Sequence, residues 1–307
     1  MRPLWLILPG LFLFLLFNLW PIVYSVYISF TDANIRNFPT PPPWAPEELK
    51  QARPPPDYVG LKNYVSIFAG PAASGFFNAF LWTLIFVAVS VPAKVAVGTL
   101  VGLLMSSEKV LGKSIMRAFL VVPWALPLIL SVVAWRYVFD PAFGPVNQLL
   151  RYFGVGNPPD WIVNKDYAYA AMVVIETWLA YPFIMTVVIG ALANVPRAAY
   201  EAAYIDGAGR WDIFTKITLP LIKRPLIYAS VMTAAASLQF FLVAFLWNFI
   251  QLYDRFILAY GYYWAFGSPF REYGLAAAVL TVSALFISVF MLAAIRLTGL
   301  LKGAYES

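Results

Sequence analysis

The stretch EAAYIDGAGRWDIFTKITLP, residues 201–220, is polar, punctuated by glycine and closed by proline, and it lies between long apolar runs. The chain has 307 residues, of which 62% are hydrophobic and only 12% are charged. A soluble globular protein has roughly 25% charged residues. The composition therefore indicates a membrane protein, and a polar stretch of this kind is expected outside the bilayer.

The residues in and around this stretch predict two short helices joined by a glycine turn. Pro196 suits a first helical turn, and RAAYEAAYI after it is rich in helix formers. Gly207 supplies a stop where a positive φ is easily adopted, and Gly209 allows a sharp turn. RWDIFTKI then favours a second short helix, which Pro220 and Pro225 are expected to close.

The side chains of this helix–turn–helix unit suit a compact element that docks on a partner protein. Three small residues, Ala202, Ala203 and Ala208, permit close approach of a partner. An apolar face is formed by Trp211, Phe214 and Ile217, and two carboxylates, Glu201 and Asp206, add charge. The alternative is an amphipathic helix that rests on lipid. The glycines and the carboxylates both favour docking.

Six runs are long and apolar enough to span a bilayer, which takes about 20 residues. They lie at about 4–30, 76–104, 115–139, 167–192, 226–250 and 273–297. The first run has one leading arginine and no small-residue cleavage site, so we interpret it as an uncleaved helix and not as a signal peptide. The sequence therefore predicts an all-α polytopic membrane protein with six transmembrane helices.

An even number of spans places both termini on one side, and the charges favour the cytoplasm. The inner segments would then carry 11 Lys/Arg and five acidic residues, and the longer outer segments nine of each. The net excess of +6 lies entirely on the inner side. The positive-inside rule counts Lys/Arg and not net charge, and by that measure 11 against 9 is a modest bias, with a higher density in the shorter inner segments. We expect a plasma (inner) membrane protein whose positive charge faces the cytoplasm, with no nucleic-acid partner.

Several chemistries have no residues to support them. The chain has no cysteine and no histidine, which excludes disulfides, zinc and haem ligation, thiol chemistry and imidazole catalysis. Its few carboxylates are scattered. GKS at 112–114 matches the tail of a phosphate-binding loop, but Ser107 stands where that loop needs glycine. We therefore expect no catalytic residue, no metal and no cofactor in this chain.

Two features of the outer segments and spans leave alternatives open. The proline-rich segment 31–75 is either a stiff connector or a docking element for an external partner.

Lys94 and Glu176 lie about 18 and 9 residues into their spans, so their depths are expected to differ by about 13 Å. We expect no direct pair: Lys94 would snorkel to the inner surface, and Glu176 would line an aqueous path or form hydrogen bonds between helices.

The stretch 201–220 resembles the EAA loop of membrane subunits of binding-protein-dependent ABC importers. The matching residues are Glu201, Ala202, Ala203, Asp206, Gly207, Ala208, Phe214, Ile217, Leu219 and Pro220. LPGLFLFLLFNLWPIVYSVYISFTD, YVGLKNYVSIF, VVPWALPLILSVVAWRYVFDPAFGPVN, WLAYPFIM and AFGSPFREYGLAAAV resemble other segments of the carbohydrate-uptake (maltose-type) branch. LYDRFILAYG replaces the usual T-G-G-P stretch after the fifth helix.

The resemblance implies a type I (MetI-like) ABC importer transmembrane domain. Its expected parts are a first helix at 1–30, the outer segment 31–75, the importer domain at 76–297 with a coupling loop at 193–224, and a cytoplasmic tail at 298–307. The implied partners are a second homologous permease subunit, two copies of an ATPase subunit that binds ATP and Mg, and an extracytoplasmic substrate-binding protein. The coupling loop would dock on the ATPase.

The resemblance also implies a multi-pass permease that forms half of the path for a sugar, with a di- or oligosaccharide as the expected class, and that is not itself an enzyme. The positions that match sugar contacts of the maltose-type subunit, with one polar neighbour, are Leu179, Ala180, Phe183, Thr233, Ser237, Gln239 and Phe240. These residues could equally be ordinary helix-packing residues. The alternatives are import of another solute, such as a phosphorylated polyol, or a channel or scaffold outside the ABC class.

Overall fold

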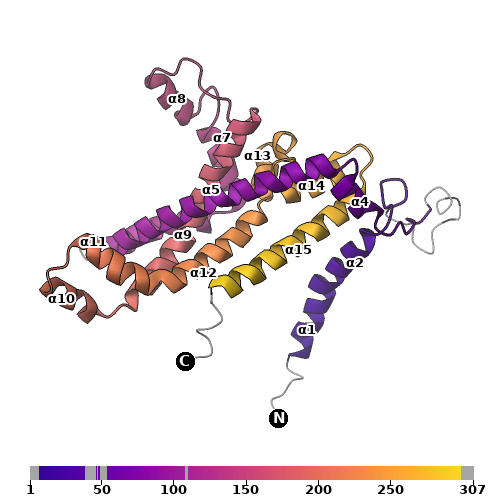
Figure 1. Ribbon diagram of the computed structural model, residues 1–307. Coiled ribbons are helices and arrows are strands. Elements are labelled where there is room, and N and C mark those ends of the chain that lie inside the picture. The colour runs from indigo at the N-terminus through magenta and orange to yellow at the C-terminus, as the bar shows by residue number, and fades with distance from the viewer. Residues whose placement is uncertain (1–6, 39–45, 47, 49–53, 108–109, 299–307) are drawn as a thin grey trace, which may run out of the picture. The chain divides into compact units, whose positions relative to one another are not determined.

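The computed structural model describes residues 7–38, 46, 48, 54–107 and 110–298 (Figure 1). Helices dominate this part of the chain, and its β-structure is one isolated bridge between Thr31 and Tyr58. The middle of the proline-rich segment and the predicted tail beyond Thr298 lie outside the described residues.

Four helices are long and apolar enough to cross a bilayer. The first, Leu8–Ile28, comprises α1 (Leu8–Phe14), a π-helical turn η2 (Leu15–Leu19) and α2 (Trp20–Ile28). The others are α5 (Ala73–Ser106), α9 (Lys165–Ala193) and α15 (Tyr273–Thr298). These four agree with the predicted runs, although α5 extends beyond its predicted run at both ends.

Two further spans are bent helix pairs, and they bring the total for the described residues to six. The helices α6 (Lys113–Ala125) and α7 (Leu128–Val138) meet at 96°. Leu126 between them is extended, the conformation that a following proline, here Pro127, favours. The second pair bends by 43° between Arg210–Leu238 and α13 (Leu242–Leu252).

Shorter helices connect the spans. They are α4 (Lys62–Ala69), α8 (Pro145–Tyr152), α10 (Arg197–Ile205), α14 (Ile257–Tyr262) and the π-helical turn η4 (Tyr263–Gly267). The segment Arg210–Leu238 consists of α11 (Arg210–Ile213), η3 (Phe214–Thr218) and α12 (Leu219–Leu238).

The described chain forms two compact units. The first contains residues 1–81 and 253–286. Its core joins α4, the start of α5, α14 and α15 through side chains that include Ile67, Phe76, Tyr260 and Val279. The apolar side chains of α1, η2 and α2 are almost all exposed, as expected of a helix that lies against lipid.

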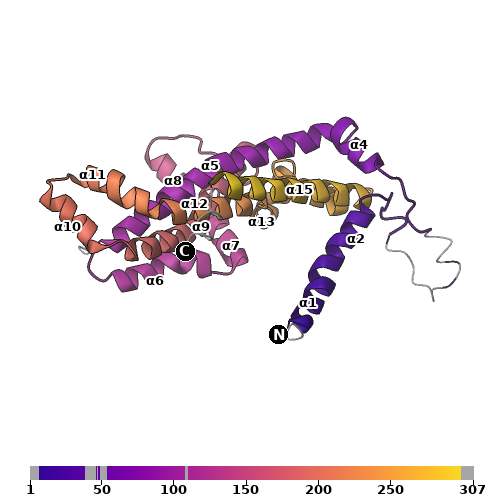
Figure 2. The same cartoon turned by 60° about the horizontal axis from the view of Figure 1, so that its bottom comes forward.

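The second unit contains residues 82–252 and 287–307, and α9 is its central helix. Helices α6, α12 and α13 pack on α9 (Figure 2). The C-terminal half of α5 packs there too, because Gly98 and Gly102 have no side chains. A Cβ on Gly98 would lie 2.5 Å from Ile184 Cβ, and one on Gly102 would lie 2.8 Å from Val188 Cβ. This G-x-x-x-G spacing allows two membrane helices to approach closely. This spacing is visible in the sequence, but it was not used to predict the contact between α5 and α9.

The close contact between α5 and α9 predicts that Gly98 tolerates no side chain. Gly98→Ala is expected to destabilise the protein by about 1–3 kcal/mol, as overpacking does, because the new Cβ would also lie 2.7 Å from the Tyr181 carbonyl. The melting temperature of the purified protein measures this. Gly190→Ala is the matched control, since a Cβ there meets nothing within 4 Å. Equal melting temperatures for the two variants would contradict the prediction.

Candidate functional site

Gly207 closes helix α10 in a Schellman motif, as the glycine pattern predicts. Its φ is +73°. The Ala208 N–H donates to the Ala203 carbonyl (2.9 Å), and the Gly207 N–H donates to the Tyr204 carbonyl (3.1 Å). These two bonds satisfy carbonyls that the end of a helix otherwise leaves free. Pro196 occupies the N-cap position at the other end of α10 and makes no side-chain capping bond.

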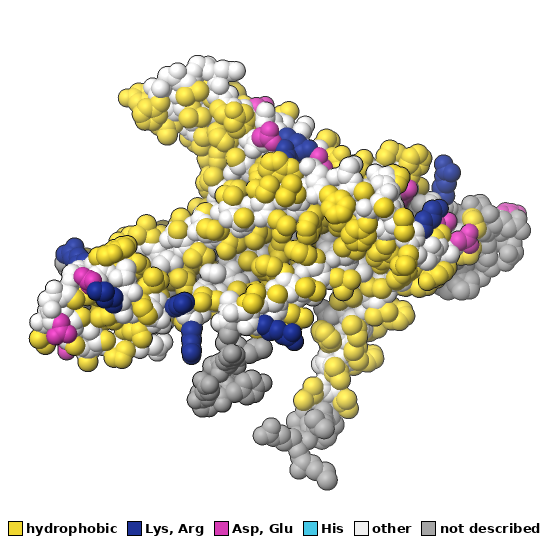
Figure 3. Space-filling model, in the orientation of Figure 1, with side chains coloured by type: hydrophobic (Ala, Val, Ile, Leu, Met, Phe, Trp, Pro, Cys, Tyr) yellow, Lys and Arg dark blue, Asp and Glu magenta, His cyan; other side chains and the backbone are white. Residues whose placement is uncertain are grey.

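The coupling loop (193–224) presents an exposed surface at one end of the second unit. Charged side chains gather there, over α10 and α11, while the helices behind them are largely hydrophobic on their surface (Figure 3). Glu201 is exposed, and its side chain has no hydrogen bond or ion pair with any described residue. Tyr204, Ile205 and Trp211 are 64%, 86% and 74% exposed. The sequence analysis missed Tyr204 and Ile205, although apolar residues in a short polar helix are a usable signal.

A second site lies inside the second unit, where three helices bring polar side chains together. Lys94 of α5 donates from Nζ to Glu176 Oε1 of α9 (2.6 Å) and to Ser237 Oγ of α12 (2.6 Å). Ser237 Oγ lies 2.7 Å from Glu176 Oε1 and 2.8 Å from the Thr233 carbonyl, so its one proton serves one acceptor at a time. We call Lys94, Glu176 and Ser237 the polar triad.

The polar triad is buried, and it is not fully satisfied. Lys94 is 0% exposed and Glu176 is 7% exposed. Glu176 Oε2 is buried without a hydrogen-bond partner among the described residues. A carboxylate oxygen in this position can accept a hydrogen bond from a solute that reaches it.

A family model of the binding-protein-dependent transport system inner membrane component matches residues 94–297. The chain belongs to this family. The match covers the polar triad and the whole segment 193–224, so both sites lie within the part that the family model describes.

Sequence relatives include the maltose/maltodextrin transport system permease protein MalF of Salmonella typhimurium and that of Escherichia coli. Each is 32% identical over 276 residues, which is 83% of this permease and 51% of the relative. This permease thus spans about half the length of the relatives it matches. Among solved structures, a bacterial ABC transporter involved in import of the acidic polysaccharide alginate is 20% identical, with a TM-score of 0.76 over 95% of this permease and 93% of that chain. That likeness supports the fold.

The direct Lys94–Glu176 pair corrects the sequence analysis, which expected Lys94 to snorkel. Helices α5 and α9 run parallel, and the Gly98–Ile184 and Gly102–Val188 contacts set their register. By this register Lys94 is level with Ala180, so Glu176 lies only one turn further along toward the N-terminal ends. Side chains lean toward the N-terminus of a helix, and the Lys94 side chain crosses that turn. The error came from treating the two predicted spans as starting at the same depth.

The other residues expected along the sugar path have more ordinary surroundings. Phe240 is buried against Phe86, with ring centroids 4.6 Å apart. Phe183 packs beside the core cluster around Ile184. Gln239 is exposed and donates to the Ala235 carbonyl of its own helix (3.2 Å). Leu179 and Ala180 are half-buried. Of the expected set, Ser237 belongs to the polar triad, and the Thr233 carbonyl lies 2.8 Å from Ser237 Oγ.

The second helix of the coupling loop is not short, which corrects another expectation. It runs on through Pro220 and Pro225 to Leu238. The π-helical turn η3 precedes Pro220, and there the Leu219 N–H donates to the Phe214 carbonyl five residues back. This wider turn offers an account of how the helix continues past a residue that lacks an N–H. The long helix links the coupling loop to Ser237 through continuous backbone.

Gly207 has open space around it, because a Cβ built on it meets nothing within 4 Å. The cost of a side chain therefore comes from its positive φ alone.

Proposed function

We propose that this permease forms half of the translocation path of an ATP-driven importer for a di- or oligosaccharide. An extracytoplasmic binding protein delivers the sugar, a second homologous permease subunit completes the path, and two separate ATPase subunits hydrolyse ATP. Both termini lie in the cytoplasm. The alternative, import of a phosphorylated polyol, would need an excess of cationic groups along the path, and the polar triad instead pairs its cation with a carboxylate.

The observation that carries the proposal is the coupling loop. Helix α10 is closed at its C-terminus by the Schellman bonds, and its exposed Glu201, Tyr204 and Ile205 offer one carboxylate and two largely apolar groups to a partner. The helix that follows leads to Ser237 of the polar triad. Movement of the loop can thereby reach the path directly. A channel or scaffold outside the ABC class has no need of such a connection.

The chemistry of the path supports a hydroxylated solute. Glu176 Oε2 is an acceptor with no partner among the described residues. Lys94 balances the charge of Glu176, so the site favours a neutral donor such as a sugar hydroxyl over an anion. The similarity to maltose/maltodextrin permeases supports the same class of solute.

The function is tested with the assembled transporter reconstituted in vesicles. We expect a binding protein loaded with a di- or oligosaccharide to stimulate ATP hydrolysis and drive uptake of that sugar. The same binding protein without sugar is the control. Stimulation only by binding proteins loaded with amino acids or peptides would rule out the sugar assignment.

The orientation predicts which positions an impermeant thiol reagent reaches from outside intact cells. Because the chain has no cysteine, single substitutions give a clean background. Asn157→Cys and Ala52→Cys are expected to be labelled, and Ser107→Cys and Gly209→Cys to be labelled only after permeabilisation; Ala52 lies outside the described residues. Labelling of Gly209→Cys in intact cells would contradict the proposed topology.

A further inference from the structure

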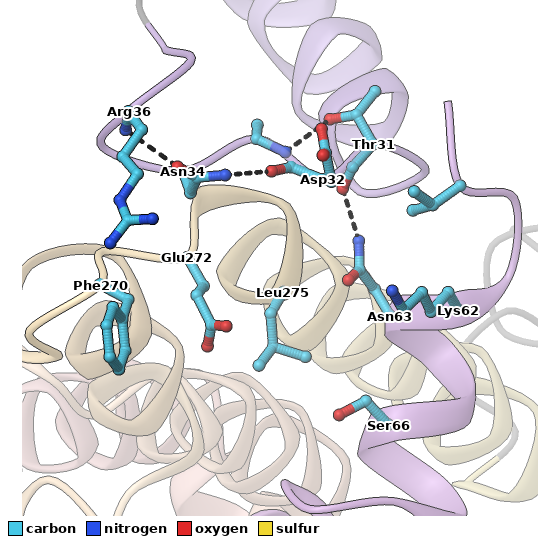
Figure 4. A pocket seen from close by; sticks show the side chains of 12 residues that line it. Thr31, Asp32, Asn34, Arg36, Lys62, Asn63, Ser66, Phe270, Glu272 and Leu275 are labelled. Carbon is cyan, nitrogen blue, oxygen red and sulfur yellow. Dashed lines mark hydrogen bonds between the residues drawn. The ribbon is translucent and has the colours of Figure 1, made fainter. Parts of the chain in front are cut away.

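The first unit contains a cavity of about 360 Å³ that the transport function does not use. Residues from three segments line it: 31–36 after α2, 59–66 around α4, and 270–275 at the start of α15 (Figure 4). Its volume is at the lower end of the range for sites of small molecules.

The walls of this cavity are held in place by hydrogen bonds between the three segments. Asn63 Nδ2 donates to the carbonyls of Ser29 (2.9 Å) and Thr31 (2.8 Å). The Gly274 N–H donates to the Ala33 carbonyl (2.9 Å), and a side chain on Gly274 would overlap the Thr31 carbonyl. The cavity is therefore preformed, which lowers the cost of binding a ligand.

Four charged side chains line the cavity, and one of them has a structural role. Asp32 Oδ1 accepts from Asn37 Nδ2 (3.0 Å) and from the Asp57 N–H (2.7 Å). The side chains of Arg36, Lys62 and Glu272 make no hydrogen bond or ion pair with any described residue. Burial raises the pKa of the Glu272 carboxyl, because it takes the charged form out of water.

Two cationic side chains and one carboxylate line this cavity without a partner among the described residues. Such a lining fits a ligand that carries both a negative and a positive group. Arg36 and Lys62 lie on opposite sides of the hollow (Figure 4), and each can donate to an anionic phosphate that enters between them. Glu272 can accept charge-assisted hydrogen bonds from a primary ammonium group. Phe270 also lines the cavity and is 62% exposed, so it offers an apolar edge. In Figure 4, Arg36, Phe270 and Glu272 lie around one side of the hollow, and Asn63 and Ser66 on the other.

The position of the cavity along the chain matches the depth of lipid headgroups. Thr31 lies three residues beyond the end of the span Leu8–Ile28, and Glu272 directly precedes α15. The Gly274–Ala33 hydrogen bond keeps these two span ends level. The headgroup layer is about 5–8 Å thick on each side of the hydrocarbon, so the cavity opens where phosphate and ammonium groups are concentrated.

We propose that this cavity binds the zwitterionic headgroup of phosphatidylethanolamine. The phosphate lies between Arg36 and Lys62, and the ammonium donates to Glu272. Phosphatidylcholine is a poorer ligand, because its quaternary ammonium has no N–H to donate. Phosphatidylglycerol is poorer because it leaves Glu272 without a cation. The proposal does not depend on which solute the permease transports.

The test uses the assembled transporter, stripped of lipid in detergent and titrated with the three phospholipids carrying the same acyl chains. Native mass spectrometry counts the lipids bound. We expect phosphatidylethanolamine to bind at least about tenfold more tightly than the other two, the difference expected for one charge-assisted hydrogen bond. Glu272→Gln should abolish the preference over phosphatidylcholine, and Arg36→Gln should weaken binding of both zwitterionic lipids.

Glu48→Gln is the control, since it removes the same charge from an exposed position that does not line the cavity. It should keep the preference. Equal binding of the three lipids by the unaltered transporter, or an unchanged preference in Glu272→Gln, would overturn the proposal. If soluble phosphoethanolamine competes for the cavity as strongly as phosphatidylethanolamine does, the ligand would be the free headgroup compound and not the lipid. A maltodextrin that binds in a Glu272-dependent way, when the lipids show no preference, would overturn it in favour of a sugar site.

Discussion

Gly207→Val and Glu201→Lys are each expected to reduce sugar uptake to near background while the permease stays in the membrane. A non-glycine residue at the φ of +73° costs roughly 1–2 kcal/mol, and a β-branched side chain fits that region worst. The Schellman bonds at the end of α10 would be strained, and Tyr204 and Ile205 beside them would lose their position. Lysine at 201 replaces the exposed carboxylate by a cation. The measurements are uptake and ATPase activity in reconstituted vesicles, beside subunit abundance.

Two matched variants separate coupling from general damage. Gly207→Asn should retain much of the uptake, because asparagine tolerates the left-handed region better than other side chains do. Gly209→Ala should be nearly silent, since Gly209 has an extended backbone (φ −71°, ψ 163°) and a Cβ there meets nothing closer than 3.6 Å. Normal uptake in both Gly207→Val and Glu201→Lys would show that the loop does not couple ATP hydrolysis to transport.

Lys94→Met is expected to destabilise the permease by about 3–5 kcal/mol, the usual cost of removing one partner of a buried ion pair. Glu176 would keep a charge that is 7% exposed and that has lost its cation. The double variant Lys94→Met/Glu176→Gln should recover most of the stability, because it removes both charges. Thermal unfolding of the purified transporter measures the three proteins, and the double-mutant cycle measures the coupling between the two side chains.

Lys216→Met supplies the contrast. Its ion pair with Asp212 has the same 2.6 Å separation, but the two side chains are 74% and 47% exposed, so its loss should cost only about 0–1 kcal/mol. If Lys94→Met and Lys216→Met lower the stability of the protein by the same amount, the prediction for the buried Lys94–Glu176 pair is wrong. Uptake by the double variant is expected to stay low, since Glu176 Oε2 is proposed to contact the solute. Uptake that returns together with stability would assign the triad a purely structural role.

The spans and the coupling loop could be predicted because the signals for both are local. A bilayer selects apolar runs by their length and composition, whatever their neighbours are. The Schellman motif joins Ala203, Tyr204, Gly207 and Ala208, all within six residues, so a glycine at the right spacing is enough to indicate it. The break between α6 and α7 also has a local cause in Pro127, although no break was predicted there.

The polar triad could not be predicted in the same way, because it depends on the register between helices. Lys94, Glu176 and Ser237 come from three spans that are far apart in the sequence. A shift of α5 along α9 by one turn, about 5.4 Å, would separate the two charges without changing the hydropathy of either helix. The close contact at Gly98 and Gly102 sets that register.

The sequence by itself therefore determined which segments are long and apolar enough to cross the membrane and how helix α10 ends. Only the tertiary structure decided that Lys94 pairs with Glu176, that α12 continues past two prolines to Ser237, and that Arg36, Lys62 and Glu272 surround one cavity. The physical reason is common to these features. Hydrophobic length and helix capping act between residues near in sequence, whereas ion pairs and cavities depend on how far each helix slides along its neighbours.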